Sequence, residues 1–240
     1  MKDRSPPTHP PGKGKTFKDK VLEKGADWIQ HHTPLKNFDA YVVGFHCARD
    51  EPSMQMEAHH YCKLVNDDFL QCVIFDGNTE NANLIGIEYI VSEQLFDELP
   101  EEEKSYWHPH NYEVFSGTLI APGLPDVAEH ELMQMLVNSY GKTWHTWHTG
   151  RHDQGPGDRL PMGDPKLMWS FNRFGEADEE MKRDRDEAMG LNPDKKRKQR
   201  QDLVERAHPQ RGVDLLKDAF PDADETPPPG VQEAEMSTKF

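Results

Sequence analysis

The chain has 240 residues, a formal net charge of −15 and only 35% apolar residues. With a mean hydropathy of −0.89 it is too polar to fold along its whole length, so we expect one folded domain with unfolded ends. The negative charge argues against general binding to nucleic acid, because neutralising phosphates requires clustered Lys and Arg.

The N-terminal part divides into two segments. Residues 1–15 are rich in Pro, Lys and Gly and are predicted to be disordered. A helix is predicted to follow, capped by Thr16, with Phe17, Val21 and Trp28 near one face. The chain is therefore expected to begin with an unfolded arm and a helix that has one apolar face.

The middle of the chain has the pattern of β-strands. Residues alternate between two faces over 41–47, and further strands are predicted at 58–64, 69–75 and 84–91. The polar sequence Asn66-Asp67-Asp68 separates two of these strands. Such a turn predicts that they form a β-hairpin.

The second half is predicted to mix helices and strands. Residues 111–120 have the composition of a strand. The clearest helix is predicted to begin at Asp126, with Glu129 completing a capping box and Gly141 just past its end. The last strands are predicted at residues 143–149 and 167–171.

Together these elements predict an α+β fold with a mixed or antiparallel sheet, a few flanking helices and disordered N- and C-terminal tails. We expect a single α+β domain over 16–175, a charged helical extension over 176–208 and a mostly disordered tail over 209–240. The extension contains the one basic run of the chain, at 195–200. We interpret it as a solvated helix face, not a localisation signal or a contact for an anionic surface.

Cysteine usage and hydropathy bear on the compartment. The odd count of three cysteines, with no CxxC pair, favours a reducing compartment over a disulfide framework. The first residues lack the apolar stretch of a signal peptide. No apolar run approaches the ~18 residues that a transmembrane helix needs. We therefore expect a cytoplasmic protein that does not span a membrane.

The thirteen histidines are the most informative feature of the sequence. Histidine is the most common metal ligand, and a His-x-His pair on a strand places both imidazoles on one face. The same alternation allows only one of two adjacent histidines to reach a shared site. The candidate metal ligands are His59, His60, His108, His110 and His145, with Glu113 as a further ligand or general base.

Imidazoles and a carboxylate without paired thiolates suit one divalent metal ion, namely Zn²⁺, Fe²⁺ or Mn²⁺. The aromatic residues beside these histidines would lower the local dielectric around such a site. The alternative is a structural role, in which half-buried histidines bond to carbonyls and the aromatic residues form core. The residues alone leave both interpretations open.

Several short blocks occur in an order that resembles a known family. They are 57–62 (EAHHYC), 85–92 (IGIEYIVS), 99–104 (LPEEEK), 107–117 (WHPHNYEVFSG), 140–147 (YGKTWHTW) and 157–163 (GDRLPMG). Over roughly residues 35–200 they resemble the oil body-associated protein family, known first from plant seeds. The resemblance implies that some members associate with the surface of lipid droplets. It brings no established reaction, cofactor or catalytic residue with it.

Three functional hypotheses follow. The first is an oil body-associated-like protein of unestablished molecular activity that attaches peripherally to lipid droplets. The second is a small metal-dependent enzyme that uses the histidine-rich site. The third is an interaction module whose histidines have no chemical role. If the protein contacts lipid droplets, it is expected to do so from outside the hydrocarbon, because no segment could satisfy its backbone there.

Overall fold

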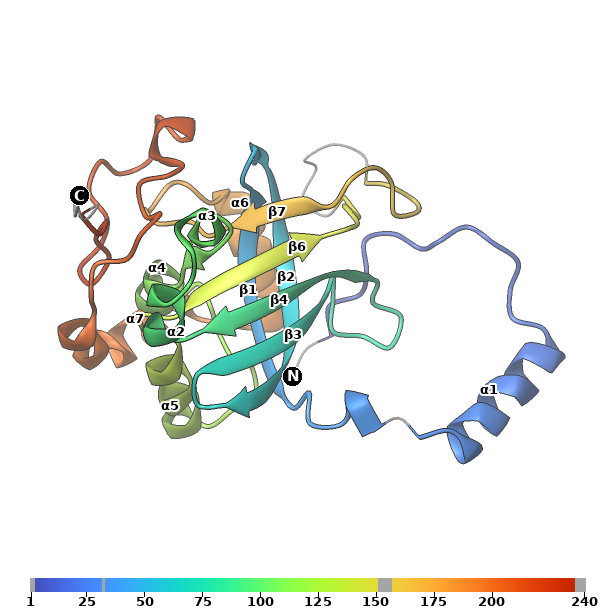
Figure 1. Ribbon diagram of the computed structural model, residues 1–240. Helices are drawn as coiled ribbons and strands as arrows, with labels where there is room; N and C mark the ends of the chain where they lie inside the picture. The colour runs from blue at the N-terminus through green and yellow to red at the C-terminus, as the bar shows by residue number, and fades with distance from the viewer. Residues whose placement is uncertain (1–2, 32, 151–156, 236–240) are drawn as a thin grey trace.

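The fold is a β-barrel with helices beside it, seen in a computed structural model that describes residues 3–31, 33–150 and 157–235 (Figure 1). The strands are β1 (Ala40–Ala48), β2 (Glu51–Asn66), β3 (Phe69–Phe75), β4 (Leu84–Val91), β5 (His108–Pro109), β6 (Tyr140–His145) and β7 (Lys166–Trp169). They pair in the order β4-β3-β2-β1-β7-β6-β5, and β6 also pairs with β4. This last pairing closes β1–β4, β6 and β7 into an antiparallel barrel, and β5 pairs with the start of β6.

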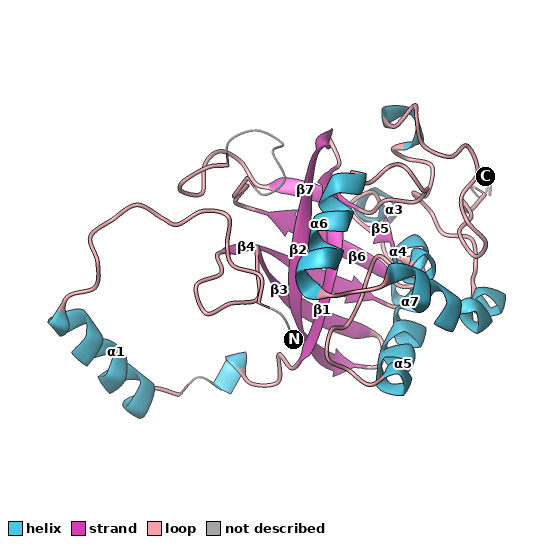
Figure 2. Ribbon diagram, turned by 180° about the vertical axis from the view of Figure 1, so that it is seen from behind, coloured by secondary structure: helices cyan, strands magenta, loops and turns pink. Residues whose placement is uncertain are grey.

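The helices lie mainly on one side of the barrel. They are α1 (Phe17–Ile29), α2 (Glu93–Asp97), α3 (Glu101–Lys104), α4 (Asn111–Ser116), α5 (Asp126–Leu136), α6 (Glu179–Met189) and α7 (Pro193–Gln199), with 3-10 turns at Thr33–Leu35, Gln201–Arg206 and Lys217–Ala219. Helices α4, α5 and α7 gather at one end of the barrel, and α6 lies across β1 and β2 (Figure 2). The main core joins Cys62 and Ile90 of the barrel to Val114 of α4 and Met133 of α5. Helix α1 stands clear of the barrel in both views.

Many of the predicted elements are confirmed. The α+β class and the antiparallel sheet are present, and closure into a barrel is more specific than the sequence predicted. The predicted hairpin is formed by β2 and β3, and the strand predicted at 84–91 is β4. Thr16 caps α1 in a capping box with Asp19. Regular alternation and local capping signals therefore located these elements correctly.

The strand predicted over 111–120 is wrong, because Asn111–Ser116 forms helix α4 and ends at Gly117 with φ 77°. All six residues of α4 are buried, so the helix has no polar face and its sequence shows no helical period. Ile120 then forms only an isolated bridge with Val43 of β1. A short, wholly buried helix rich in aromatic and branched residues is indistinguishable from a buried strand by pattern alone.

The boundaries of α5 also differ from the prediction. Its N-cap is Pro125, not a capping box at Asp126, and its last residue is Leu136. The turn after it uses Asn138, which has φ 64°, whereas Gly141 lies within β6. Asp126 and Glu129 at the start of this helix instead form ion pairs with basic residues of α7.

The expectation that the cysteines form no disulfide is wrong. Cys62 and Cys72 lie directly opposite each other in the register of β2 and β3 and form a disulfide. The predicted hairpin already implied this pairing, because the two residues are equally spaced about its turn. Cys47 is free and buried. The odd cysteine count therefore carried no information about pairing.

The C-terminal segment after residue 209, which the sequence predicts to be mostly disordered, packs against the rest of the protein. Val213 and Val231 are buried in the main core. Gln210 forms a parallel bridge with Glu233. At the other end of the chain, Arg4 is buried and its guanidinium contacts Glu57. Single buried residues therefore attach these polar, Pro-rich segments to the body of the protein. The average composition of a segment does not reveal such single residues.

The charged region after residue 175 is also tied to the barrel helices by a buried ion pair. Arg200 lies after α7, and its Nη2 is 2.8 Å from Oε1 of Glu129 on α5. The same guanidinium donates through Nη1 to the carbonyl of Val114. Lys196 contacts the other carboxylate oxygen of Glu129 at 2.8 Å. Both members of the Arg200–Glu129 pair are buried.

We predict that Arg200→Met lowers the free energy of unfolding by about 3 kcal/mol, because it leaves a buried carboxylate short of its main partner. Urea denaturation measures this change. The matched control is Arg183→Met on α6, whose exposed pair with Glu180 spans 4.0 Å and should contribute less than ~0.5 kcal/mol. Equal stability of the two variants would show that the charged region is not part of the folded core.

Candidate metal centre inside the barrel

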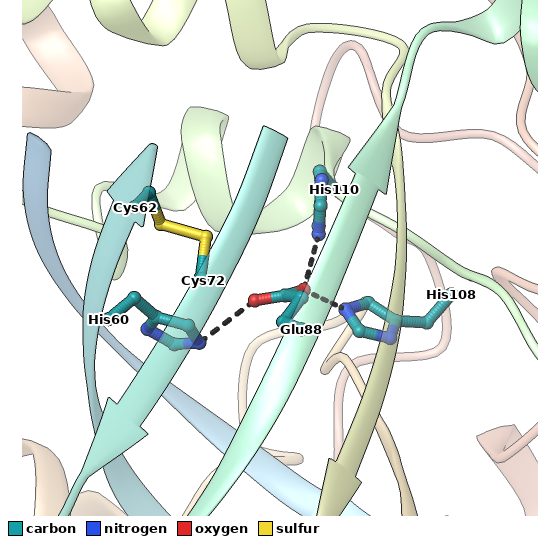
Figure 3. The surroundings of a disulfide bond; sticks show 6 residues. All are labelled: His60, Cys62, Cys72, Glu88, His108 and His110. Atoms are coloured by element: carbon teal, nitrogen blue, oxygen red, sulfur yellow. Dashed lines mark hydrogen bonds and ion pairs between the residues drawn. A yellow bond between two sulfur atoms is a disulfide. The ribbon is translucent and has the colours of Figure 1, made fainter. Parts of the chain in front are cut away.

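A buried carboxylate, Glu88 of β4, is the centre of the candidate site (Figure 3). Its neighbours Ile87 and Tyr89 are exposed, so strand alternation turns Glu88 toward the barrel interior. Its Oε2 lies 2.9 Å from Nε2 of His60, a residue of β2. Its Oε1 lies 3.4 Å from Nε2 of His108 in β5 and 3.4 Å from Nε2 of His110 at the start of α4. One carboxylate thus contacts three imidazoles from three segments.

A fourth imidazole, His46 of β1, completes the inner group. Its ring centroid is 5.0 Å from that of His60 and 5.6 Å from that of His108. Potential ligand atoms of His46, His60 and Glu88 lie within 4.8 Å of one another, as do those of Glu88, His108 and His110. We call these five residues (His46, His60, Glu88, His108 and His110) the histidine–carboxylate cluster.

His145 and Glu113 lie at the edge of the cluster. Nε2 of His145 is 3.4 Å from Nδ1 of His46, and its Nδ1 faces the sulfur of Met56 at 2.7 Å. The carboxyl Oε2 of Glu113 is 3.8 Å from Nε2 of His110. Two of the residues predicted from sequence therefore border the cluster without touching Glu88.

His59 does not join the cluster, because it lies on the opposite face of β2 from His60. Its Nε2 is 2.7 Å from Oε1 of Glu57, and its Nδ1 is 2.7 Å from the hydroxyl of Tyr41. Glu57 in turn pairs with Arg4. Strand alternation requires this separation of adjacent residues. His59 has the partners of a structural histidine.

The imidazoles of His60 and His108 are buried without hydrogen bonds among the described residues. Nε2 of His60 and Nε2 of His108 both approach Glu88, but neither contact has the alignment of a hydrogen bond. An unsatisfied buried polar group costs about 1–3 kcal/mol. The Nε2 atoms of these two histidines face Glu88 together with that of His110, and a metal ion bound there would satisfy them.

A glycine keeps this space open. A Cβ at Gly141 of β6 would lie 2.6 Å from Nε2 of His110 and 2.7 Å from Nε2 of His108, and it would collide with Oε1 of Glu88. Any other residue here would therefore displace three of the ligand atoms. The close approach of the β6 backbone is what brings these groups together.

The electrostatics suit metal binding. Burial lowers the pKa of His46 and His108, and it lowers the pKa of His145 to about 3, so these imidazoles are neutral. Burial by itself raises the pKa of Glu88, but the surrounding histidines outweigh it and hold that pKa well below its ordinary value. Burial, with the nearby charge of Glu88, raises the pKa of Glu113 well above the ordinary range. The cluster thus offers neutral imidazoles at His46 and His108 and one ionised carboxylate, beside a protonated carboxyl group.

The sequence reasoning missed His46 and Glu88. Both occur inside predicted strands, and neither belongs to one of the histidine groups. The available signal was the pattern of β4, where Glu88 is the only charged residue of the strand and has apolar neighbours on both sides. A charge at an inward position of a strand is costly unless it has partners, so it marks a site.

Comparison with known proteins places the chain in a family. A family described as "Protein of unknown function (DUF1264)" matches residues 32–204. Oil body-associated protein 1A of Zea mays is 37% identical over 209 residues, covering 87% of this chain and 84% of that protein. The chain belongs to the oil body-associated protein family.

Two further members are similar to the chain. Oil body-associated protein 2B of Arabidopsis thaliana is 41% identical over 71% of this chain and 68% of that protein. Oil body-associated protein 2A of Arabidopsis thaliana is 42% identical over 67% of this chain, and the match spans 63% of its length, less than two thirds. No solved structure matches the chain. Within the described residues, no helix is long and apolar enough to cross a membrane.

We predict that Gly141→Ala destabilises the barrel by about 2 kcal/mol, because the added methyl group overpacks the three ligand atoms. Chemical denaturation measures this loss. Gly25→Ala in α1 is the matched control, since a Cβ there meets no atom within 4 Å. If the two variants unfold at the same denaturant concentration, the space between Gly141 and Glu88 can accept a methyl group and the prediction is wrong.

Proposed function

We propose that this member of the oil body-associated protein family is a metal-dependent enzyme. It binds one divalent ion, Zn²⁺, Fe²⁺ or Mn²⁺, through Glu88, His60, His108 and His110, with His46 beside them. The observation that carries the proposal is the convergence of three buried imidazoles, those of His60, His108 and His110, on the carboxylate of Glu88. Neutral imidazoles and one carboxylate are the donor set that these metals prefer.

The surrounding residues suit acid–base work at such an ion. A bound divalent ion would act as a Lewis acid toward an oxygen of the substrate. The carboxyl group of Glu113 is buried with its Oε2 3.8 Å from Nε2 of His110, which places it to donate a proton to that substrate. His145 contacts His46 from outside the cluster and orients its ring. In this proposal Glu113 is the general acid, and His145 is a positioning residue.

We predict that protein purified without a polyhistidine tag contains close to one metal ion per chain by elemental analysis, as expected for a single buried site. The double variant His108→Ala/His110→Ala should lose this metal. The control His130→Ala/His208→Ala removes two histidines that form ion pairs at the surface, and it should retain the metal.

Circular dichroism must show that both double variants are folded. A folded wild-type protein that takes up none of the three ions after dialysis against them would refute the proposal. Loss of metal from the His130/His208 control would refute the assignment of the ligands.

We further propose that the protein attaches peripherally to lipid droplets, and that α1 makes the contact. Oil bodies appear in the names of the relatives. In this chain, Phe17, Trp28 and Ile29 of α1 are 83%, 89% and 71% exposed, and no residue of the helix is buried. An isolated helix of 13 residues is marginally stable in water, so it gains from a surface that buries its apolar side. Exposed Trp and Phe side chains on one face are typical of helices that lie in a lipid interface.

We predict that Phe17→Asp/Trp28→Asp abolishes co-flotation with triolein droplets coated with phosphatidylcholine, because it places two charges on the face that would enter the interface. Leu124→Asp/Val127→Asp is the control, since it changes exposed apolar residues near the start of α5. A carbonate wash should release the wild-type protein from the droplets. Retention after that wash, or equal flotation of both double variants, would contradict attachment through α1.

A further inference from the structure

A second cavity lies outside the barrel and plays no part in the functions proposed above. It has a volume of about 650 Å³ and lies between α3, β7 and the C-terminal segment. Trp107 and Trp169 form its apolar wall together with Leu215. Both indoles are fixed, because Trp107 Nε1 donates to Glu103 and Trp169 Nε1 donates to the carbonyl of Gly212. The volume falls within the range of small-molecule pockets, about 300–1,000 Å³.

Three basic side chains line this apolar cavity, namely Arg49, Lys104 and Arg211. In a chain with a net charge of −15, such a grouping is notable. Arg49 pairs with the exposed carboxylate of Asp50, whereas Lys104 and Arg211 share the single carboxylate of Glu101. Guanidinium and ammonium groups carry several donors, which leaves N–H groups for a ligand.

The acidic residues of the cavity are already bound within the protein. Glu233 accepts hydrogen bonds from the backbone amides of Gly212 and Asp214. The carboxylate of Asp214 pairs with Arg173. These two carboxylates therefore already have partners within the protein, and the groups left to meet a ligand are the N–H groups of the three basic side chains.

We infer that this cavity binds an amphipathic organic anion, with an acyl or aryl group against Trp107 and Trp169 and a carboxylate or phosphate at Arg49, Lys104 and Arg211. Apolar walls with a few convergent polar groups are the usual form of a small-molecule site. Arginine forks bind carboxylate and phosphate alike. The site is separate from the barrel cluster, although the Trp169 ring lies 6.1 Å from that of His108 and forms the wall between them.

Titration of the full chain with decanoate, decyl phosphate and the uncharged decanol tests this inference by calorimetry. We expect decanoate or decyl phosphate to bind at least about tenfold more tightly than decanol, because a single charge-assisted hydrogen bond changes the affinity by about that factor. Comparison of the two anions identifies the preferred head group. Binding of decanol as tight as that of both anions would overturn the inference.

Two variants locate the binding. Ala234→Trp fills the cavity without removing a basic residue and should abolish binding of the anion, and Lys104→Met/Arg211→Met should weaken it by about tenfold or more. Lys182→Met/Arg183→Met removes two cations from α6 and should leave the affinity unchanged. Unchanged binding in Ala234→Trp would place the ligand elsewhere and overturn the inference. The metal-site variant His108→Ala/His110→Ala should still bind the anion, so failure of one proposal is distinguishable from failure of the other.

Discussion

The ionised carboxylate of Glu88 inside the barrel is the constraint on which the central structure depends. A buried charge is expensive unless close partners offset its desolvation. Here the offset comes from His60 of β2, His108 of β5 and His110 at the start of α4, all within 3.4 Å of its oxygens. The carboxylate therefore links the sheet to the segment that leads into the covering helices. A fold that failed to bring these segments together would leave the charge uncompensated.

Closure of the barrel brings the histidines and Glu88 together. The pairing of β4 with β6 places Gly141 opposite Ile90, two residues from Glu88. β5 pairs with the same glycine from the other side through His108. Because Gly141 has no side chain, the ligand atoms of β4 and β5 converge against its backbone. Beside them, the Cys62–Cys72 disulfide joins β2 to β3 next to His60 and Glu88 (Figure 3). The site is thus a consequence of strand register.

This dependence explains what the sequence could and could not predict. Strands with regular alternation and the hairpin were predictable because their signals are local. So was the separation of His59 from His60, which follows from strand parity. Helix α4 was missed because its complete burial removes any period. Glu88 was missed because its role arises from the pairing of β4 with the distant strand β6, which no local pattern encodes. His46 was missed because its ring meets those of His108 and His145, which come from segments far along the chain.

The family match covers only part of the chain, residues 32–204, and this part holds some of the proposed functional residues but not all of them. Residues 32–204 contain all five residues of the histidine–carboxylate cluster, together with Glu113 and His145. Helix α1 precedes that region, and the C-terminal segment that supplies Arg211 and Leu215 to the second cavity follows it. The proposed chemistry therefore lies in the part shared with the family. The proposed lipid contact and one wall of the anion pocket lie in flanking segments, which can change without disturbing the register that holds Glu88.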